Sequence, residues 1–220
     1  MTRVEGILER VDPFHLPIFQ YKDAINDEQC EALIKMCEQH QYAPSVPPHP
    51  GMEEKSRMST GVSLDKTVLN RIPDMKEHFE ILLQDISRQI FRQNSEGFEI
   101  KSSWCTKTEK GQGSPLHMHK NYYMAGVLYL QEDNDLIIEC PHWMNSHFLF
   151  PVYQQSPYTS NSALINSPKN CFLLMPAWMK HEIPVWQKDE VRYSIAMNFH
   201  PLVTMDLKHR GYLLNSIGKP

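Results

Sequence analysis

The chain has 220 residues, of which 41% are hydrophobic and 22% are charged, as expected for a soluble domain with its own core. Its 22 basic and 26 acidic residues give a net charge of −4, which argues against a dedicated binder of nucleic acid or of anionic membranes. No apolar run is long enough to cross a bilayer, and the five cysteines form no CxxC pair, which favours a reducing, cytoplasmic compartment.

The N-terminal part, residues 1–96, is predicted to be mainly helical. A short strand within residues 14–25 leads to Asn26, which is suited to cap a helix whose apolar residues recur at helical spacing. Four prolines and a glycine predict a surface loop over residues 43–60. After Pro73 a longer helix carries an apolar stripe, which indicates packing against a sheet.

From Gly97 onward the pattern changes to short strands separated by turn-forming clusters. The strand-like segments lie around residues 98–100, 125–129, 136–138, 148–152, 171–175 and 193–199. This spacing predicts an antiparallel sandwich or barrel over residues 97–202. We therefore expect an α+β fold in one domain of residues 1–220, with helices supporting a β-rich core and a tail of residues 203–220 left unassigned.

Two histidines, His117 and His119, stand two residues apart just before a predicted strand. Side chains at this spacing share one face of a strand, so both imidazoles can bind one ion. A third histidine, His181, follows a later apolar strand and begins the next one. The three residues form a candidate metal site, although each part of the pattern is weak alone.

Arg192 follows His181 by eleven residues and shares a strand face with Ser194. An arginine inside a barrel must find an anion, because an unpaired buried guanidinium is very costly. A carboxylate accepts two hydrogen bonds from a guanidinium, and the Ser194 hydroxyl can donate another to the same group. The pair is therefore a candidate site for a carboxylate ligand.

The stretch from Trp104 to Asn198 resembles the double-stranded β-helix oxygenases that use 2-oxoglutarate and Fe(II). It is similar to a branch whose pattern runs through a tryptophan, HxH, "FPxwxxHxV" and "RxSxxxN". The resemblance implies a jelly-roll, cupin-like core in an enzyme that needs Fe(II), 2-oxoglutarate and O2. It also implies hydroxylation of an unidentified substrate, with release of succinate and CO2.

The same resemblance suggests a role for each site residue. The metal ligands at the catalytic centre would be His117, His119 and His181, and the cosubstrate anchors would be Arg192 and Ser194. His119 stands where most members of the superfamily carry a carboxylate. Tyr123, just after the pair, can either reach the cosubstrate through its hydroxyl or form part of the barrel wall. Glu139 is expected to be a strand-end carboxylate rather than a ligand.

Two alternatives remain open at this point. Imidazole also suits zinc, copper and nickel, so a three-histidine enzyme that does not use 2-oxoglutarate, such as a thiol dioxygenase or a zinc hydrolase, fits the same residues. The second alternative is a binding module with the same jelly-roll fold and no catalytic activity. The primary substrate can be a small molecule or a peptide side chain, and residues 43–60 and 141–170 are candidate lids or substrate contacts.

Overall fold

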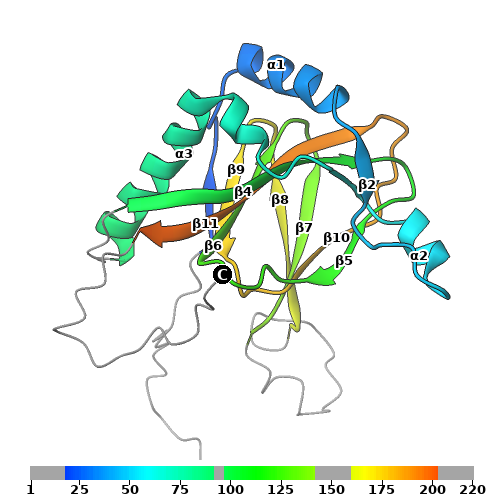
Figure 1. The fold of residues 1–220 in the computed structure, drawn as a ribbon. Helices are drawn as coiled ribbons and strands as arrows, with labels where there is room; N and C mark the ends of the chain where they lie inside the picture. The colour runs from blue at the N-terminus through cyan, green and yellow to red at the C-terminus, as the bar shows by residue number, and fades with distance from the viewer. Residues whose placement is uncertain (1–17, 92–96, 142–159, 203–220) are drawn as a thin grey trace, which may run out of the picture.

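The computed structural model describes residues 18–91, 97–141 and 160–202, which form two antiparallel β-sheets with helices on one side (Figure 1). The strands of the larger sheet are β1 (Phe19–Tyr21), β2 (Tyr42–Pro44), β3 (Gly61–Ser63), β4 (Gly97–Thr108), β6 (Met124–Tyr129), β9 (Phe172–Pro176) and β11 (Arg192–Leu202). Those of the smaller sheet are β5 (Ser114–His117), β7 (Asn134–Glu139), β8 (Ser162–Ser167) and β10 (His181–Ile183). The strand orders are β1-β9-β6-β11-β4-β3-β2 and β5-β10-β7-β8.

The helical elements lie between the first strands of the chain. They are α1 (Asp27–Glu38), α2 (Glu53–Arg57), α3 (Pro73–Ile86), a 3-10 turn η1 (Val68–Arg71) and a π-helical turn η2 (Ser87–Phe91). Asn26 caps α1 as predicted, because its side chain accepts the Gln29 N–H at 2.8 Å while the Gln29 side chain accepts the Asn26 N–H at 2.9 Å. This reciprocal pair fixes where the helix begins.

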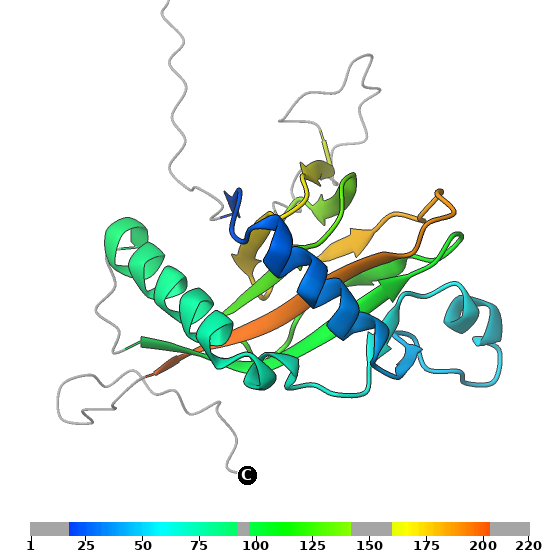
Figure 2. The same cartoon turned by 90° about the horizontal axis from the view of Figure 1, so that it is seen from above.

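The two long helices cover the outer face of the larger sheet (Figure 2). Leu33 of α1 and Phe79 of α3 are fully buried in a core shared with Phe172 and Phe199 of the sheet. The rings of Phe79 and Phe172 lie 4.6 Å apart between centroids. Burial of side chains this large stabilises the contact by about 2 kcal/mol each, so the helices hold the sheet rigid behind the site.

Alternation along β11 divides the larger sheet into two faces. Ile195, Met197 and Phe199 point into the core under the helices. Ser194 and Asn198 point the other way, toward the smaller sheet. A second apolar cluster fills part of the space between the sheets and joins residues of β6, β7 and β9. The polar face of β11 therefore lies inside the fold, between the two sheets.

The structure differs from the sequence prediction in the N-terminal part. The short strand predicted within residues 14–25 is present as β1 at one edge of the larger sheet, but this part also supplies β2 and β3, which were not predicted and lie at the other edge. The predicted loop 43–60 contains the short helix α2, and the candidate lid 141–170 contains strand β8. These elements are too short or too polar to show a period in the sequence. The predicted strand at residues 148–152 lies outside the described residues.

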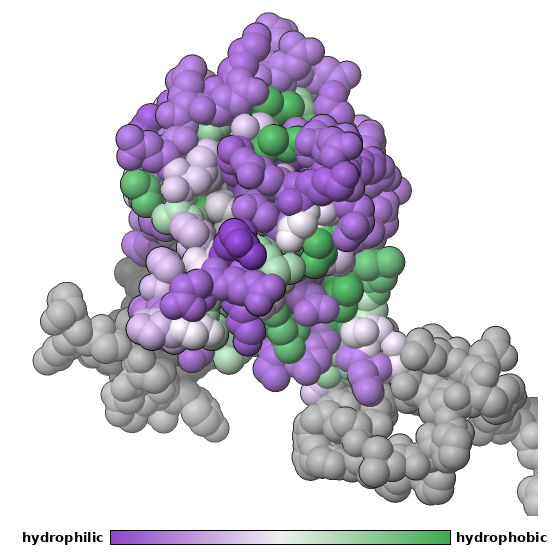
Figure 3. Space-filling model, turned by 90° about the vertical axis from the view of Figure 1, so that its right-hand side faces the viewer, coloured by the Kyte–Doolittle hydropathy of each residue, from purple (hydrophilic) through white to green (hydrophobic). Residues whose placement is uncertain are grey.

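The face of the molecule in Figure 3 is largely hydrophilic, and its apolar side chains gather in small groups. Leu116 and Met118, the neighbours of His117 in the chain, are among the large apolar side chains that remain exposed. Within the described ranges, no helix combines the length and the apolar composition needed to cross a membrane.

Candidate metal centre

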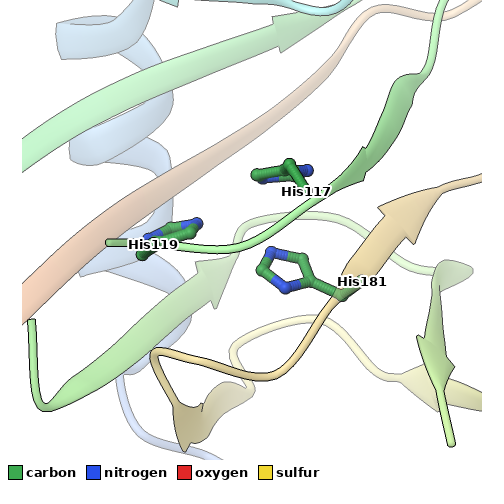
Figure 4. Close-up of side chains that lie close together, drawn as sticks. All are labelled: His117, His119 and His181. Carbon is green, nitrogen blue, oxygen red and sulfur yellow. The ribbon is translucent and has the colours of Figure 1, made fainter. Parts of the chain in front are cut away.

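Three histidines from two neighbouring strands converge at one end of the space between the sheets (Figure 4). His117 is the last residue of β5, and His181 is the first of β10, where the two residues pair directly across the ladder. His119 lies just beyond the end of β5, where its N–H donates to the Ala177 carbonyl at 2.9 Å. One ring nitrogen of each histidine lies within 4.8 Å of the others, so the three side chains can share one ion.

Backbone carbonyls orient two of the three rings. Nδ1 of His117 lies 2.8 Å from the carbonyl oxygen of Pro115, and Nδ1 of His181 lies 2.9 Å from that of Met179. A carbonyl oxygen only accepts, so each Nδ1 carries the proton and donates it. The Nε2 atoms of both rings are left with free lone pairs, which is the tautomer that binds a metal through Nε2.

A side chain orients the third ring. Nδ1 of His119 lies 2.5 Å from Oδ1 of Asn198 in β11, and Nδ2 of the same amide donates to Ser102 Oγ at 3.0 Å. With the amide in this orientation Oδ1 accepts from the imidazole, so His119 Nδ1 carries the proton. All three histidines thus present an unprotonated Nε2.

Burial favours the neutral form of two of the imidazoles, those of His119 and His181. His181 is only 4% exposed, and this burial lowers its pKa to about 3, with a further contribution from neighbouring His117. Burial also lowers the pKa of His119, although its hydrogen bond to Asn198 acts in the opposite direction. Neutral imidazole is the form that ligates a metal, so the donor set fits a divalent first-row ion such as Fe(II).

The group contains no carboxylate or thiolate from the described parts of the chain. Glu139 is directed elsewhere, because its side chain forms an ion pair with Lys180 at 3.0 Å, as expected for a carboxylate at a strand end. Three neutral imidazoles bring no charge of their own, so a divalent ion here keeps its full charge.

A cavity of about 500 Å³ opens between the two sheets beside the histidines. Strands β4, β6 and β11 of the larger sheet form one wall, and β5, β7 and β10 of the smaller sheet form the other. Residues that precede β4 in the chain complete the lining, including Thr60 and Lys66. A cavity of this size holds a small ligand and part of a second one.

One polar row crosses the larger sheet at the far end of this cavity. Ser194 in β11 pairs in register with Thr106 in β4 and with Tyr129 in β6. All three residues line the cavity, and the Ser194 and Thr106 hydroxyls lie 2.6 Å apart. Burial raises the pKa of the Tyr129 hydroxyl, so this group stays protonated and can donate a hydrogen bond to a ligand.

Arg192 lies two residues before Ser194 on the same face of β11 and is 5% exposed. Its guanidinium stacks on the Trp186 ring at 4.8 Å from the centroid, and it forms no ion pair with any carboxylate in the described ranges. Burial lowers the pKa of Arg192, but an arginine remains charged at neutral pH. This charge lies just behind the cavity wall rather than in its lining.

The structure does not bring Tyr123 into the cavity. Its ring stacks on Phe98 with 5.6 Å between centroids and packs against the core beneath the helices. Tyr122 lines the cavity instead, where its hydroxyl accepts from Ser102 Oγ at 3.5 Å. Adjacent residues point to opposite faces of an extended chain, and the sequence had no marker for which of the two tyrosines faces inward.

Sequence reasoning also missed the positions of Asn198 and Tyr129. Asn198 matched the family pattern but was open to a packing role, whereas the structure places its amide on His119. The signal in the sequence was the spacing Arg192, Ser194, Asn198, which puts all three residues on one face of a strand. Tyr129 had no such signal, because only the pairing register places it beside Ser194.

Comparison with known proteins agrees with this geometry. Residues 102–198 match a family model described as "Putative 2OG-Fe(II) oxygenase". No curated protein sequence matches the chain.

Several solved structures share the fold at low sequence identity. A prolyl-4-hydroxylase from Pseudomonas putida aligns with a TM-score of 0.56 at 13% identity, covering 84% of this chain and 92% of that one. HygX from Streptomyces hygroscopicus, solved with nickel and 2-oxoglutarate bound, aligns with a TM-score of 0.55 at 12% identity, covering 90% and 92%. A prolyl hydroxylase from Trichoplax adhaerens aligns with a TM-score of 0.55 at 10% identity, covering 83% of each chain. These likenesses confirm the predicted double-stranded β-helix fold.

Proposed function

We propose that the domain is a 2-oxoglutarate/Fe(II) oxygenase that hydroxylates a C–H bond of its primary substrate, a proposal that the family match over residues 102–198 supports. In this reaction the substrate, O2 and 2-oxoglutarate give the hydroxylated product, succinate and CO2. One oxygen atom enters the product and the other enters succinate, so the two-electron oxidation of the C–H bond is matched by the oxidative decarboxylation of the cosubstrate. The bound iron supplies this redox chemistry, and the protein supplies binding, orientation and exclusion of water.

The approach of one ring nitrogen from each of the three histidines to within 4.8 Å of the others is the observation that carries the proposal. We assign His117, His119 and His181 as the iron ligands. The carbonyls of Pro115 and Met179 set the tautomers of two of these rings before any metal binds. A site with its donors already oriented loses little conformational entropy on binding, which favours a tight complex.

The polar row and the buried arginine support a cosubstrate site next to the metal. We assign Arg192 and Ser194 as anchors of the far carboxylate of 2-oxoglutarate, with Tyr129 as a third donor. Arg192 brings a buried positive charge that forms no ion pair within the described ranges, which favours an anionic ligand. Ser194 points into the cavity from the same strand that carries Asn198, so one strand orients both the cosubstrate and a metal ligand.

The walls of the cavity assist the reaction through their chemistry. Val127, Leu136 and Ile183 make the space between the two ends of the site apolar. An apolar wall keeps water away from the reacting atoms and strengthens the electrostatic interactions inside the site. Burial lowers the pKa of His119 and of His181, so these two imidazoles stay neutral and do not exchange protons with the reactants at neutral pH.

The proposal can be tested with purified protein under anaerobic conditions. Addition of Fe(II) and then 2-oxoglutarate is expected to produce a weak visible charge-transfer band, and admission of air is expected to release succinate even without the primary substrate. Arg192→Ala should retain Fe(II) binding but lose most of its affinity for 2-oxoglutarate, because one charge-assisted contact is worth about 2 kcal/mol or more.

The same variants separate this function from its rivals. A three-histidine enzyme that does not use 2-oxoglutarate predicts that Arg192→Ala leaves both metal binding and turnover intact. A non-catalytic module predicts neither the band nor succinate. His181→Ala should lose the metal. The matched variant His200→Ala should behave like the parent protein, because Nδ1 of His200 lies 3.1 Å from the carbonyl oxygen of its neighbour Pro201, away from the three histidines.

A further inference from the structure

The lining of the cavity includes the positively charged side chain of Lys66. Lys66 lies between β3 and η1, and its carbonyl accepts the N–H of Ser103 at 2.8 Å, which ties this segment to β4. Its ammonium lies 5.8 Å from the centroid of the Trp104 ring. Trp104 in turn lies 5.7 Å from the His119 ring, between centroids, so the tryptophan ring is next to both the ammonium and the histidine cluster.

Lys66 forms no ion pair in the described parts of the chain, and its ammonium lies over the face of the Trp104 ring. The adjacent carboxylate of Asp65 is already engaged, because it accepts the Thr67 N–H at 2.8 Å and pairs with Arg71 at 2.8 Å. No aspartate or glutamate lines the cavity. Partial burial lowers the pKa of Lys66, as expected for an ammonium that leaves water without gaining a counter-ion.

The three-histidine ligand set makes this unpaired charge more significant. In the proposed complex, a divalent metal and the 2-oxoglutarate dianion cancel, because neutral imidazoles contribute no charge. Arg192 and Lys66 then leave two positive charges around the cavity. A carboxylate ligand would have offset one of them. Excess charge of one sign in a partly dry site is unfavourable, so the remaining space favours a negatively charged occupant.

From this arrangement, and resting on the proposed function, we infer that the primary substrate carries an acidic group that Lys66 binds. The group is a carboxylate or a phosphate, since both accept charge-assisted hydrogen bonds from an ammonium. The carbon skeleton next to it lies against Trp104, which directs the far end of the molecule toward the histidines. Lys66 is thus a specificity residue for an acid of small size or for an acidic side chain.

Binding of simple acids tests this inference without any turnover. The protein is loaded with Ni(II) and 2-oxoglutarate, and benzoate, phenyl phosphate and the neutral match benzamide are titrated by calorimetry. At least one acid is expected to bind about tenfold more tightly than benzamide, and the preference should weaken at high salt. The relative affinities of benzoate and phenyl phosphate show which acid the site prefers.

Variants assign the preference to the lysine. Lys66→Met should reduce it to about twofold or less, and Lys66→Arg should keep most of it. Lys101→Met is the matched control, because Lys101 lies in β4 but pairs with Glu99 at 2.6 Å on the surface. Equal binding of acids and benzamide, or a preference that survives in Lys66→Met, would overturn the inference.

The outcome is independent of the proposed reaction. If 2-oxoglutarate fails to bind the parent protein, the proposed function is wrong, and the same titrations are made with Ni(II) alone. A Lys66-dependent preference in that experiment would still support an acid site, whereas its absence would reject it.

Discussion

At the scale of single residues, the site depends on which ring nitrogen carries the proton. Main-chain carbonyls determine the position of the ring proton in His117 and His181. A substitution that changes only a side chain therefore leaves those two acceptors in place. His119 is different, because its acceptor is the Asn198 amide, which Ser102 holds in turn. The ring that occupies the place of the usual carboxylate is therefore the one whose orientation a mutation can change.

Asn198→Ala should weaken metal binding by about 10- to 100-fold, the usual effect of losing the partner that orients a ligand. The His119 ring would be free to rotate and to change its tautomer. Asn198→Asp should restore most of the affinity, since a carboxylate oxygen also accepts from Nδ1. Nickel titration measures both effects. Asn166→Ala is the control, because that exposed amide donates to Asp135 on the smaller sheet and does not line the cavity. Unchanged affinity in Asn198→Ala would show that the amide does not position the ring.

Burial of His181 should make the metal-free protein sensitive to acid. The ordinary pKa of histidine is about 6.5, whereas burial lowers that of His181 to about 3. Between these values the unfolded chain binds a proton that the folded chain does not, so the free energy of unfolding falls as the pH falls from 6.5 toward 3. Between pH 7 and pH 4.5 the loss is about 2–3 kcal/mol.

Urea denaturation of the metal-free protein at these two pH values tests this expectation. His181→Leu should lose less stability on acidification than the parent protein, because its position no longer titrates. His78→Leu, which alters an exposed residue of α3, should keep the parent's dependence. The same acid loss in His181→Leu as in the parent would contradict the assignment.

At the scale of elements, the strands that could be predicted were those in which apolar and polar residues alternate along the chain. The sequence predicted β11 because Ile195, Met197 and Phe199 recur every second residue, and this period also placed Ser194 and Asn198 on the opposite face. The same reasoning could not tell whether Tyr122 or Tyr123 faces the cavity. The left-handed turn at Asn121, with φ of 69°, interrupts the alternation of side chains between the two faces before β6 begins. Strands β5 and β8 stayed unpredicted, since short polar strands form only when a neighbour pairs with them.

Gly126 in β6 is expected to tolerate no side chain. A Cβ at this position would lie 2.5 Å from Cζ of Phe172 and 3.2 Å from Cε2 of Phe199, and both rings are fully buried under the helices. Gly126→Ala should therefore destabilise the protein by about 1–3 kcal/mol in urea denaturation, as overpacking does in a filled core.

A double-mutant cycle identifies the cause of that loss. Phe172→Leu creates space beside Gly126, so the double variant should be more stable than the sum of the two single losses predicts. Simple additivity would mean that the glycine is needed for its backbone conformation rather than for the approach of the ring.

At the scale of the whole molecule, the site joins parts that the sequence keeps far apart. His117 and His181 belong to the smaller sheet, Asn198 to the larger one, and Lys66 to the segment that precedes β4. The resemblance to a known family predicted that the histidines meet, because no spacing along the chain implies a distance between strands β5 and β10. Nothing in the sequence indicated that Lys66 lies in the cavity. An irregular segment has no hydrophobic period, and Lys66 comes next to Trp104 only in the tertiary fold.

A metal bound by the three histidines would tie β5 to β10 and, through the His119–Asn198 hydrogen bond, to the larger sheet, so it should stabilise the folded state. A ligand that binds only the folded state adds about 2.7 kcal/mol when its free concentration is 100 times its Kd. For a domain of this size we expect Ni(II) to raise the Tm by about 5–10 °C. The shift should disappear in His117→Ala and persist in His200→Ala. Calorimetric scans of the three proteins with and without nickel measure it, and an equal shift in His117→Ala would mean that the ion stabilises the chain from some other place.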